Sequence, residues 1–285
     1  LGDEAPHPVG SVANTAVRLA TMWLVLDLTR RLGARRVAQF VAVGLVALFG
    51  TGFESLFGQS LIFAGMTLVF ALAALRAVLV PDRSERWHAG FSAGWLVLSV
   101  FCSSYAFPVV VGVSFLYALE RRWRPAAASL VVPPVAFLVV RRLAGGAYGQ
   151  QQPFGLARVP LYIDYVQAGL TTVGEGVTGL EGLGIASFVL VVVAMALLAR
   201  RRPEQRFAAA VVVTVVSFYA QASLSRSVFG AEQASASRYA FFCGVLLIVS
   251  MAGAWGDRRV PIRTAGIVVL VLAMSLGSNI GRLID

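Results

Sequence analysis

Long runs of apolar residues alternate with short polar or glycine-containing connections along the whole chain of 285 residues. A membrane-spanning helix needs about 20 predominantly apolar residues, or fewer when the helix is short or tilted. The pattern therefore predicts an all-α, polytopic integral membrane protein that forms one transmembrane helical domain over residues 1–285. About ten segments are predicted to be transmembrane helices: 10–28, 37–53, 59–79, 90–104, 106–119, 126–143, 184–199, 207–226, 239–255 and 264–280.

The connections between these segments differ in charge. Every second connection is rich in arginine, whereas the others carry most of the acidic residues. Cytoplasmic loops of membrane proteins are enriched in basic residues. The alternation thus predicts a multi-pass protein of the inner (plasma) membrane, with both ends of this segment outside. The arginine-rich set is Arg30, Arg31, Arg35, Arg36, Arg83, Arg86, Arg121, Arg122, Arg124, Arg200, Arg201, Arg202, Arg206, Arg258, Arg259 and Arg263.

Composition agrees with a membrane protein and narrows its partners. The chain is 58% hydrophobic and its mean hydropathy is +0.78. A net charge of +10 suggests a nucleic-acid partner, but the arginines lie in short clusters between apolar runs. Membrane lipids are therefore the expected partners, and nucleic acid is not. Histidine is scarce, with His7 predicted near the outer start and His88 in a cytoplasmic loop, which excludes a histidine-rich metal site.

Residues 144–183 form the longest predicted connection, about forty residues on the outer side. Within it, Arg158–Val173 has the pattern of an amphipathic helix, with Leu161, Tyr165, Ala168 and Thr172 on one side. Tyrosines such as Tyr162 and Tyr165 suit the headgroup layer. The segment is predicted to be an interfacial helix, which either plugs the bundle or covers a lipid-linked substrate.

The first predicted span carries polar residues at helical spacing. Ser11, Asn14, Arg18 and Thr21 lie three or four positions apart and so share one helical face. A charge in a membrane helix usually faces the bundle interior, a partner or water. Two interpretations stay open for Arg18: it lines a cavity together with Asn14, or it reaches the outer headgroups.

Two arginines bracket a short connection near the end of the chain. Arg226 ends the eighth span and Arg238 begins the ninth, immediately before Tyr239. Two guanidinium groups so placed can converge on one phosphate through paired hydrogen bonds. Alternatively, they pair with Glu232 in the connection or with lipid headgroups.

Four stretches carry a resemblance to a known family. They are HPVGSVANTAVRLATMWLVLDLTRRLGAR (7–35), FGTGFESLFGQSLIFAGM (49–66), CSSYAFPVVVGVSFLYALERRWRP (102–125) and SRYAFF (237–242). In order and spacing they resemble the polytopic glycosyltransferases of the GT-C superfamily, especially the bacterial, mannosyltransferase-like branch.

The resemblance implies transfer of a sugar from a polyprenyl-phosphate donor to a cell-envelope acceptor on the outer face of the membrane. The acceptor would be a glycan, a lipid or a protein of an actinobacterial-type envelope. In the family an outer-loop carboxylate acts as base and often helps to hold a divalent metal such as Mg or Mn. With the resemblance, the candidate positions are Asp3, Glu4 and Glu54 as catalytic acids, Asp3 and Glu54 as metal ligands, and Arg238, Arg226 and Tyr239 at the donor phosphate. The further candidates for lining the cavity are Arg18, Asn14 and Tyr105.

The chain also departs from the family pattern. The family's first span and its acidic outer loop would precede Leu1, and the opening Leu-Gly-Asp-Glu predicts that the true start lies upstream. Ser103–Ser104–Tyr105 stands where many relatives carry Lys-Glu. Two alternatives therefore remain. The first is a non-catalytic membrane subunit or lipid carrier with the same fold, which would work beside other membrane subunits. The second is a small-molecule transporter, for which Pro133–Pro134 would mark a broken helix.

Overall fold

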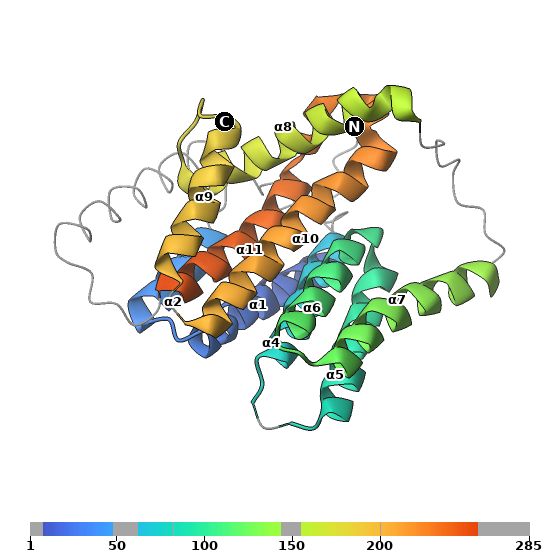
Figure 1. Ribbon diagram of the computed structural model, residues 1–285, viewed down its shortest axis with the longest axis vertical. Helices are drawn as coiled ribbons and strands as arrows, with labels where there is room; N and C mark the ends of the chain where they lie inside the picture. The colour runs from blue at the N-terminus through green and yellow to red at the C-terminus, as the bar shows by residue number, and fades with distance from the viewer. Residues whose placement is uncertain (1–7, 48–61, 82, 144–154, 200, 256–285) are drawn as a thin grey trace.

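A computed structural model of the chain describes residues 8–47, 62–81, 83–143, 155–199 and 201–255. These residues form helices joined by turns, with no strand among them (Figure 1). The prediction of an all-α protein is confirmed for the described part. The α-helices are α1 (Pro8–Arg31), α2 (Arg36–Ala47), α4 (Ile62–Val78), α5 (Glu85–Cys102), α6 (Phe107–Leu119), α7 (Trp123–Leu143), α8 (Val159–Thr178), α9 (Ile185–Leu198), α10 (Arg202–Arg226) and α11 (Ser237–Trp255), with short 3₁₀ turns η3 (Ser104–Ala106), η4 (Leu156–Arg158), η5 (Ser227–Phe229) and η6 (Ala231–Ser235).

The helices follow the apolar runs. Each predicted span from 10–28 to 239–255 overlaps one α-helix, while segment 264–280 lies outside the described residues. Within the described part, three helices are long and apolar enough to cross a membrane by length and composition: Trp123–Leu143, Arg202–Phe229 and Arg238–Trp255. Shorter apolar helices cover Arg36–Ala47, Ile62–Val78, Ser104–Leu119 and Ile185–Leu198. The chain thus has the helices of a membrane-associated protein, and the number of spans stays a prediction.

The helix ends divide into two groups. The turns from α1 to α2, from α4 to α5, from α6 to α7 and from α9 to α10 carry most of the arginines that flank helices, and we call this side the arginine-rich end. The opposite end holds η3, α8, the last turn of α10 and the first turn of α11. Arg141 and Arg142, in the last turn of α7, belong to this opposite end. The separation of charge is therefore strong but incomplete.

Helix α11 occupies the centre of the bundle. It contacts α1, α2, α8, α9 and α10, and most of its residues between Arg238 and Trp255 are buried. Helix α7 is peripheral and turns a row of leucine and valine side chains outward. An apolar outer surface of this kind suits lipid as its surroundings.

The proline positions that were ambiguous in the sequence have clear places. Pro108 lies in the first turn of α6, where a missing N–H is tolerated. The region of 90–119 therefore contains two helices separated by the η3 turn. Pro133 and Pro134 lie inside α7, which continues through them without a break.

Helix α8 is the predicted amphipathic segment, extended to Thr178 (Figure 1). It packs against α9, α10, α11 and η6. Of the four residues predicted to share one side, Tyr165 is buried and Ala168 and Thr172 are half-buried, whereas Leu161 is 48% exposed. Tyr165 is fully buried and is followed by Leu170, Val173 and Val177. The expectation that Tyr165 lies among lipid headgroups is therefore wrong.

Candidate anion-binding site

Five residues from four elements come together at the end opposite the arginine-rich one. Tyr105 comes from η3, Tyr165 from α8, Arg226 from the last turn of α10, and Arg238 with Tyr239 from the first turn of α11. Tyr165 lies within electrostatic reach of Tyr239, Arg226 and Tyr105, and Tyr105 within reach of both arginines. We call these five residues the arginine–tyrosine cluster.

The phenol groups form the inner wall of the cluster. The Tyr105 hydroxyl donates a hydrogen bond of 3.2 Å to the Tyr239 hydroxyl. The two rings meet edge to face with centroids 5.3 Å apart, and both pack against Phe218 of α10. Gln221 Nε2 donates to the Ser104 carbonyl over 3.1 Å, which holds η3 against α10.

The two arginines form the charged side of the cluster. The Arg238 guanidinium carbon lies 5.1 Å from the centroid of the Tyr239 ring, which is cation–π distance. Its Nε is buried and has no hydrogen-bond partner among the described residues. Arg226 and Arg238 are both half-buried.

Glu232 does not neutralise these arginines. It is exposed on η6, and no ion pair joins it to either arginine in the described structure. Of the interpretations that the sequence left open, the pairing with Glu232 is absent here. A site with two cationic groups and phenol hydroxyls beside them is chemically suited to an oxyanion such as phosphate.

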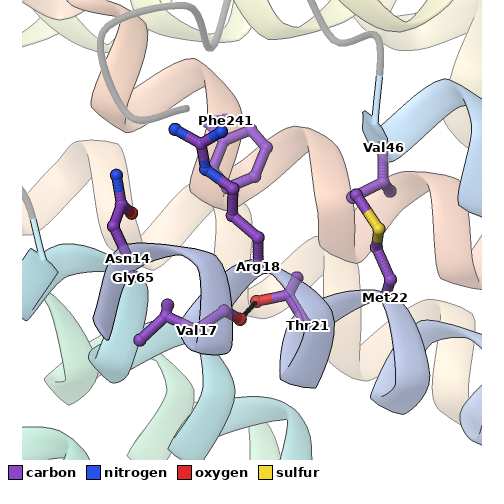
Figure 2. A pocket seen from close by; sticks show the side chains of 8 residues that line it. All are labelled: Asn14, Val17, Arg18, Thr21, Met22, Val46, Gly65 and Phe241. Atoms are coloured by element: carbon purple, nitrogen blue, oxygen red, sulfur yellow. Dashed lines mark hydrogen bonds between the residues drawn. The ribbon is translucent and has the colours of Figure 1, made fainter. Parts of the chain in front are cut away.

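Arg18 and Asn14 line a separate small pocket (Figure 2). The remaining lining residues come from α1, α2, α4 and α11: Val17, Thr21, Met22, Val46, Gly65 and Phe241. Figure 2 shows the Arg18 side chain extending from α1 toward Phe241, while the Thr21 hydroxyl donates to the Val17 carbonyl over 2.9 Å. The volume open to a water-sized sphere is about 20 Å³, enough for about one water molecule.

The pocket adjoins the cluster along α11 but is distinct from it. Phe241 follows Arg238 by three residues and so lies about one helical turn further along. Tyr105 is not among the residues that line the pocket. The structure thus places Arg18 and Asn14 together at one wall, and Tyr105 with Arg226, Arg238 and Tyr239 in the cluster.

The predicted catalytic acids and metal ligands cannot be placed. Asp3, Glu4 and Glu54 all lie outside the described residues. Within the described ranges, no three His, Cys, Asp or Glu side chains come close enough together to hold a metal ion.

No family model, curated protein or solved structure matches this chain. The resemblance to GT-C glycosyltransferases therefore rests on the four sequence stretches alone. The function of the cluster has to be argued from its own chemistry.

The arginine-rich end contains a polar network that no pattern in the sequence indicated. His88, expected in a loop, is a buried residue of α5. Its Nε2 accepts a hydrogen bond of 3.1 Å from Arg122 Nη1, and its Nδ1 lies 3.4 Å from the Tyr117 hydroxyl. The Tyr117 hydroxyl lies 2.6 Å from Ser92 Oγ. The network connects α5, α6 and the turn before α7, so we assign it a structural role.

Proposed function

We propose that this protein is an integral membrane glycosyltransferase. It moves a sugar from a polyprenyl-phosphate donor to a cell-envelope acceptor on the outer face of the membrane. The observation that carries the proposal is the arginine–tyrosine cluster, a group of two arginines and three tyrosines at one end of a bundle of apolar helices.

The proposed donor site uses the two guanidinium groups as phosphate ligands. Arg226 and Arg238 bind the donor phosphate through charge-assisted hydrogen bonds, and the Tyr239 ring beneath Arg238 holds that guanidinium in place. When the bond between sugar and phosphate breaks, negative charge grows on the phosphate. Cationic groups already aimed at that position stabilise the leaving group most in the transition state.

The proposed acceptor chemistry follows from the family resemblance. A carboxylate, from Glu54 or the Asp3–Glu4 pair, takes the proton of the acceptor hydroxyl as it attacks the anomeric carbon with inversion. Asp3 and Glu54 would hold a divalent metal such as Mg or Mn, which supplies further charge neutralisation. In the proposed topology, the chain forms about ten transmembrane helices, and both of its ends lie on the outer side of the membrane.

The second candidate is a lipid carrier or non-catalytic subunit. Many GT-C glycosyltransferases carry Lys-Glu where this chain has Ser103–Ser104–Tyr105. The Tyr105 hydroxyl donates to Tyr239 inside the cluster, so this candidate has a tyrosine at the site where those enzymes have charged residues. Such a protein would bind the lipid phosphate through the same cluster without transferring the sugar. The transporter ranks third, since α7 runs through Pro133–Pro134 without the break that it would need.

The deciding experiment supplies the protein, in membranes, with a radiolabelled polyprenyl-phosphate sugar. Donor binding and label transfer to envelope acceptors are followed for wild type, Arg238→Gln and the control Arg142→Gln. Arg142 is exposed at the same end of the bundle but lies outside the cluster. We expect transfer to fall about 100-fold in Arg238→Gln, with weakened donor binding, and to persist in Arg142→Gln.

Other outcomes redirect the assignment. Donor binding without transfer by the wild type, with Mg or Mn present, supports the carrier. Equal binding by wild type and Arg238→Gln removes the phosphate role of the cluster.

A further inference from the structure

Tyr165 has a buried hydroxyl that makes no close hydrogen bond to any described residue. The residue is 0% exposed, and its Oη has no hydrogen-bond partner among the described residues. A buried tyrosine normally finds a partner for its hydroxyl, because leaving the group without one costs free energy. The buried Tyr165 hydroxyl therefore lowers the stability of the ligand-free protein.

The surroundings of Tyr165 belong to the arginine–tyrosine cluster. The groups that act on its phenol are Tyr239, through electrostatics and a hydrogen-bonding contact too loose to satisfy the hydroxyl, and Arg226 and Tyr105. Tyr165 is one of the large side chains with almost no exposure, and it lies on the side of α8 that packs against α10 and α11. Burial raises the pKa of the Tyr165 phenol, so the group stays protonated and able to donate.

Tyr219 provides an internal contrast. Its hydroxyl is also buried without a partner among the described residues. However, its ring packs where Gly169 of α8 has no side chain. The polar groups that act on its phenol are Cys243, Tyr165 and Tyr239, with no arginine among them. The contrast separates a hydroxyl placed by ring packing from one placed beside Arg226 and the phenols of Tyr239 and Tyr105.

We infer that the Tyr165 hydroxyl is a hydrogen-bond donor to the oxyanion bound by Arg226 and Arg238, which makes α8 a direct part of the binding site. The inference rests on the proposed phosphate site and adds a residue to it. The ligand class is a phosphate oxyanion, whether on a polyprenyl chain, on a bilayer lipid or free in solution.

The test uses the whole protein in phosphatidylcholine nanodiscs with Tyr165→Phe, Tyr219→Phe, Tyr162→Phe and Arg238→Gln. Binding of polyprenyl monophosphate, phosphatidic acid and inorganic phosphate is measured separately, together with thermal unfolding without ligand. Tyr162 is a control on the same helix, and Tyr219→Phe is a control for removing a buried unsatisfied hydroxyl.

Tyr165→Phe is expected to unfold at the same or a higher temperature than wild type, because an unsatisfied polar group is removed. Its affinity for the phosphate ligand that binds the wild type is expected to fall about tenfold, as for loss of one hydrogen bond to a charged group. Tyr219→Phe and Tyr162→Phe are expected to keep wild-type affinity. The ligand that shows the Tyr165 effect identifies the source of the phosphate.

The remaining outcomes distinguish failure of the Tyr165 inference from failure of the proposed phosphate site. If Arg238→Gln loses binding while Tyr165→Phe keeps it, the Tyr165 inference fails and the phosphate site stands. If neither variant loses binding, both fail. Equal loss of affinity in Tyr165→Phe and Tyr219→Phe, or a lower unfolding temperature of Tyr165→Phe, also overturns the inference. If both Arg238→Gln and Tyr165→Phe lose binding but the wild type transfers no sugar, the inference stands and the transferase assignment fails.

Discussion

The Tyr105 hydroxyl donates a hydrogen bond to the Tyr239 hydroxyl over 3.2 Å, although the two residues are 134 positions apart in the chain. The contact joins the η3 turn to the first turn of α11. It therefore fixes the position of the Tyr239 ring, and the Arg238 guanidinium packs on that ring. Through this pair, the stretch between α5 and α6 becomes part of the candidate site.

Removal of this hydrogen bond should destabilise the protein modestly. Tyr105→Phe leaves the hydroxyl of the fully buried Tyr239 without its donor and is expected to lower the free energy of unfolding by about 1 kcal/mol. Detergent-induced unfolding of Tyr105→Phe, Tyr239→Phe and the double variant forms a double-mutant cycle. We expect the double variant to lose less than the sum of the single losses. Strict additivity would show that the pair is not coupled.

The contact of α8 with α10 depends on a glycine. A Cβ added at Gly169 would overlap the ring atoms of Tyr219, and a ring in a packed core has little room to move. Gly169→Ala is expected to cost about 2 kcal/mol and to weaken phosphate binding, because it displaces Tyr165. Gly94→Ala is the matched control, since a Cβ at this position of α5 meets nothing within 4 Å. Thermal unfolding of the control should be unchanged or slightly higher, and equal effects of the two changes would contradict the packing.

Asp27 is expected to matter more than a typical surface acid. Its Oδ2 accepts hydrogen bonds from Arg31 Nε at 2.7 Å and from Arg76 Nε at 2.6 Å, and all three side chains are mostly buried. Asp27→Asn should lower the free energy of unfolding by about 2 kcal/mol. The control is Glu85→Gln, because Glu85 pairs with Arg124 at 4.0 Å and both side chains are largely exposed. That change should cost less than about 0.5 kcal/mol, and similar losses in unfolding experiments would contradict the difference in burial.

His88 predicts a pH dependence of stability. Burial, and then the charge of Arg122, lower the pKa of this histidine from its ordinary value of 6.5. The unfolded chain therefore binds a proton at higher pH than the folded chain. The stability that comes from the neutral His88 is present above pH 6.5 and is lost as the pH falls toward the lowered folded-state pKa. Unfolding measured between pH 8 and pH 5 (roughly the range in which histidine titrates) should show a smaller decrease for His88→Asn than for wild type. Parallel curves would contradict this origin.

Helix positions were largely predictable, because an apolar run of sufficient length in a membrane protein has few alternatives to a helix. The exceptions have local causes. Helix α5 begins at Glu85, before the predicted segment 90–104, because Ser84 caps it by accepting from the Trp87 N–H at 3.2 Å. A polar first turn of this kind does not register as hydrophobic, so His88 was expected in a loop and is instead inside the helix.

The candidate site was only partly predictable for a related reason. Arg226 and Arg238 bracket a short connection, so their proximity follows from the chain itself. The approach of Tyr165 depends on how α8 packs against α10 and α11, which is set by tertiary contacts such as Gly169 against Tyr219. The approach of Tyr105 depends on the hydrogen bonds that join η3 to Gln221 of α10 and Tyr239 of α11. No local pattern in the sequence contains that information. The amphipathic pattern of α8 was visible, and of the four residues predicted to share one side only Leu161 is exposed.

The length of α9 has a consequence for the surrounding lipid. Its 14 residues, Ile185–Leu198, rise about 21 Å, whereas the hydrocarbon core of a bilayer is about 30 Å thick. If α9 crosses the membrane as proposed, the two leaflets beside it must approach each other, whereas lipid beside the longer α10 need not deform. This hydrophobic mismatch predicts that the protein distributes preferentially into thinner membranes. It also predicts that the surrounding bilayer is thinnest beside α9.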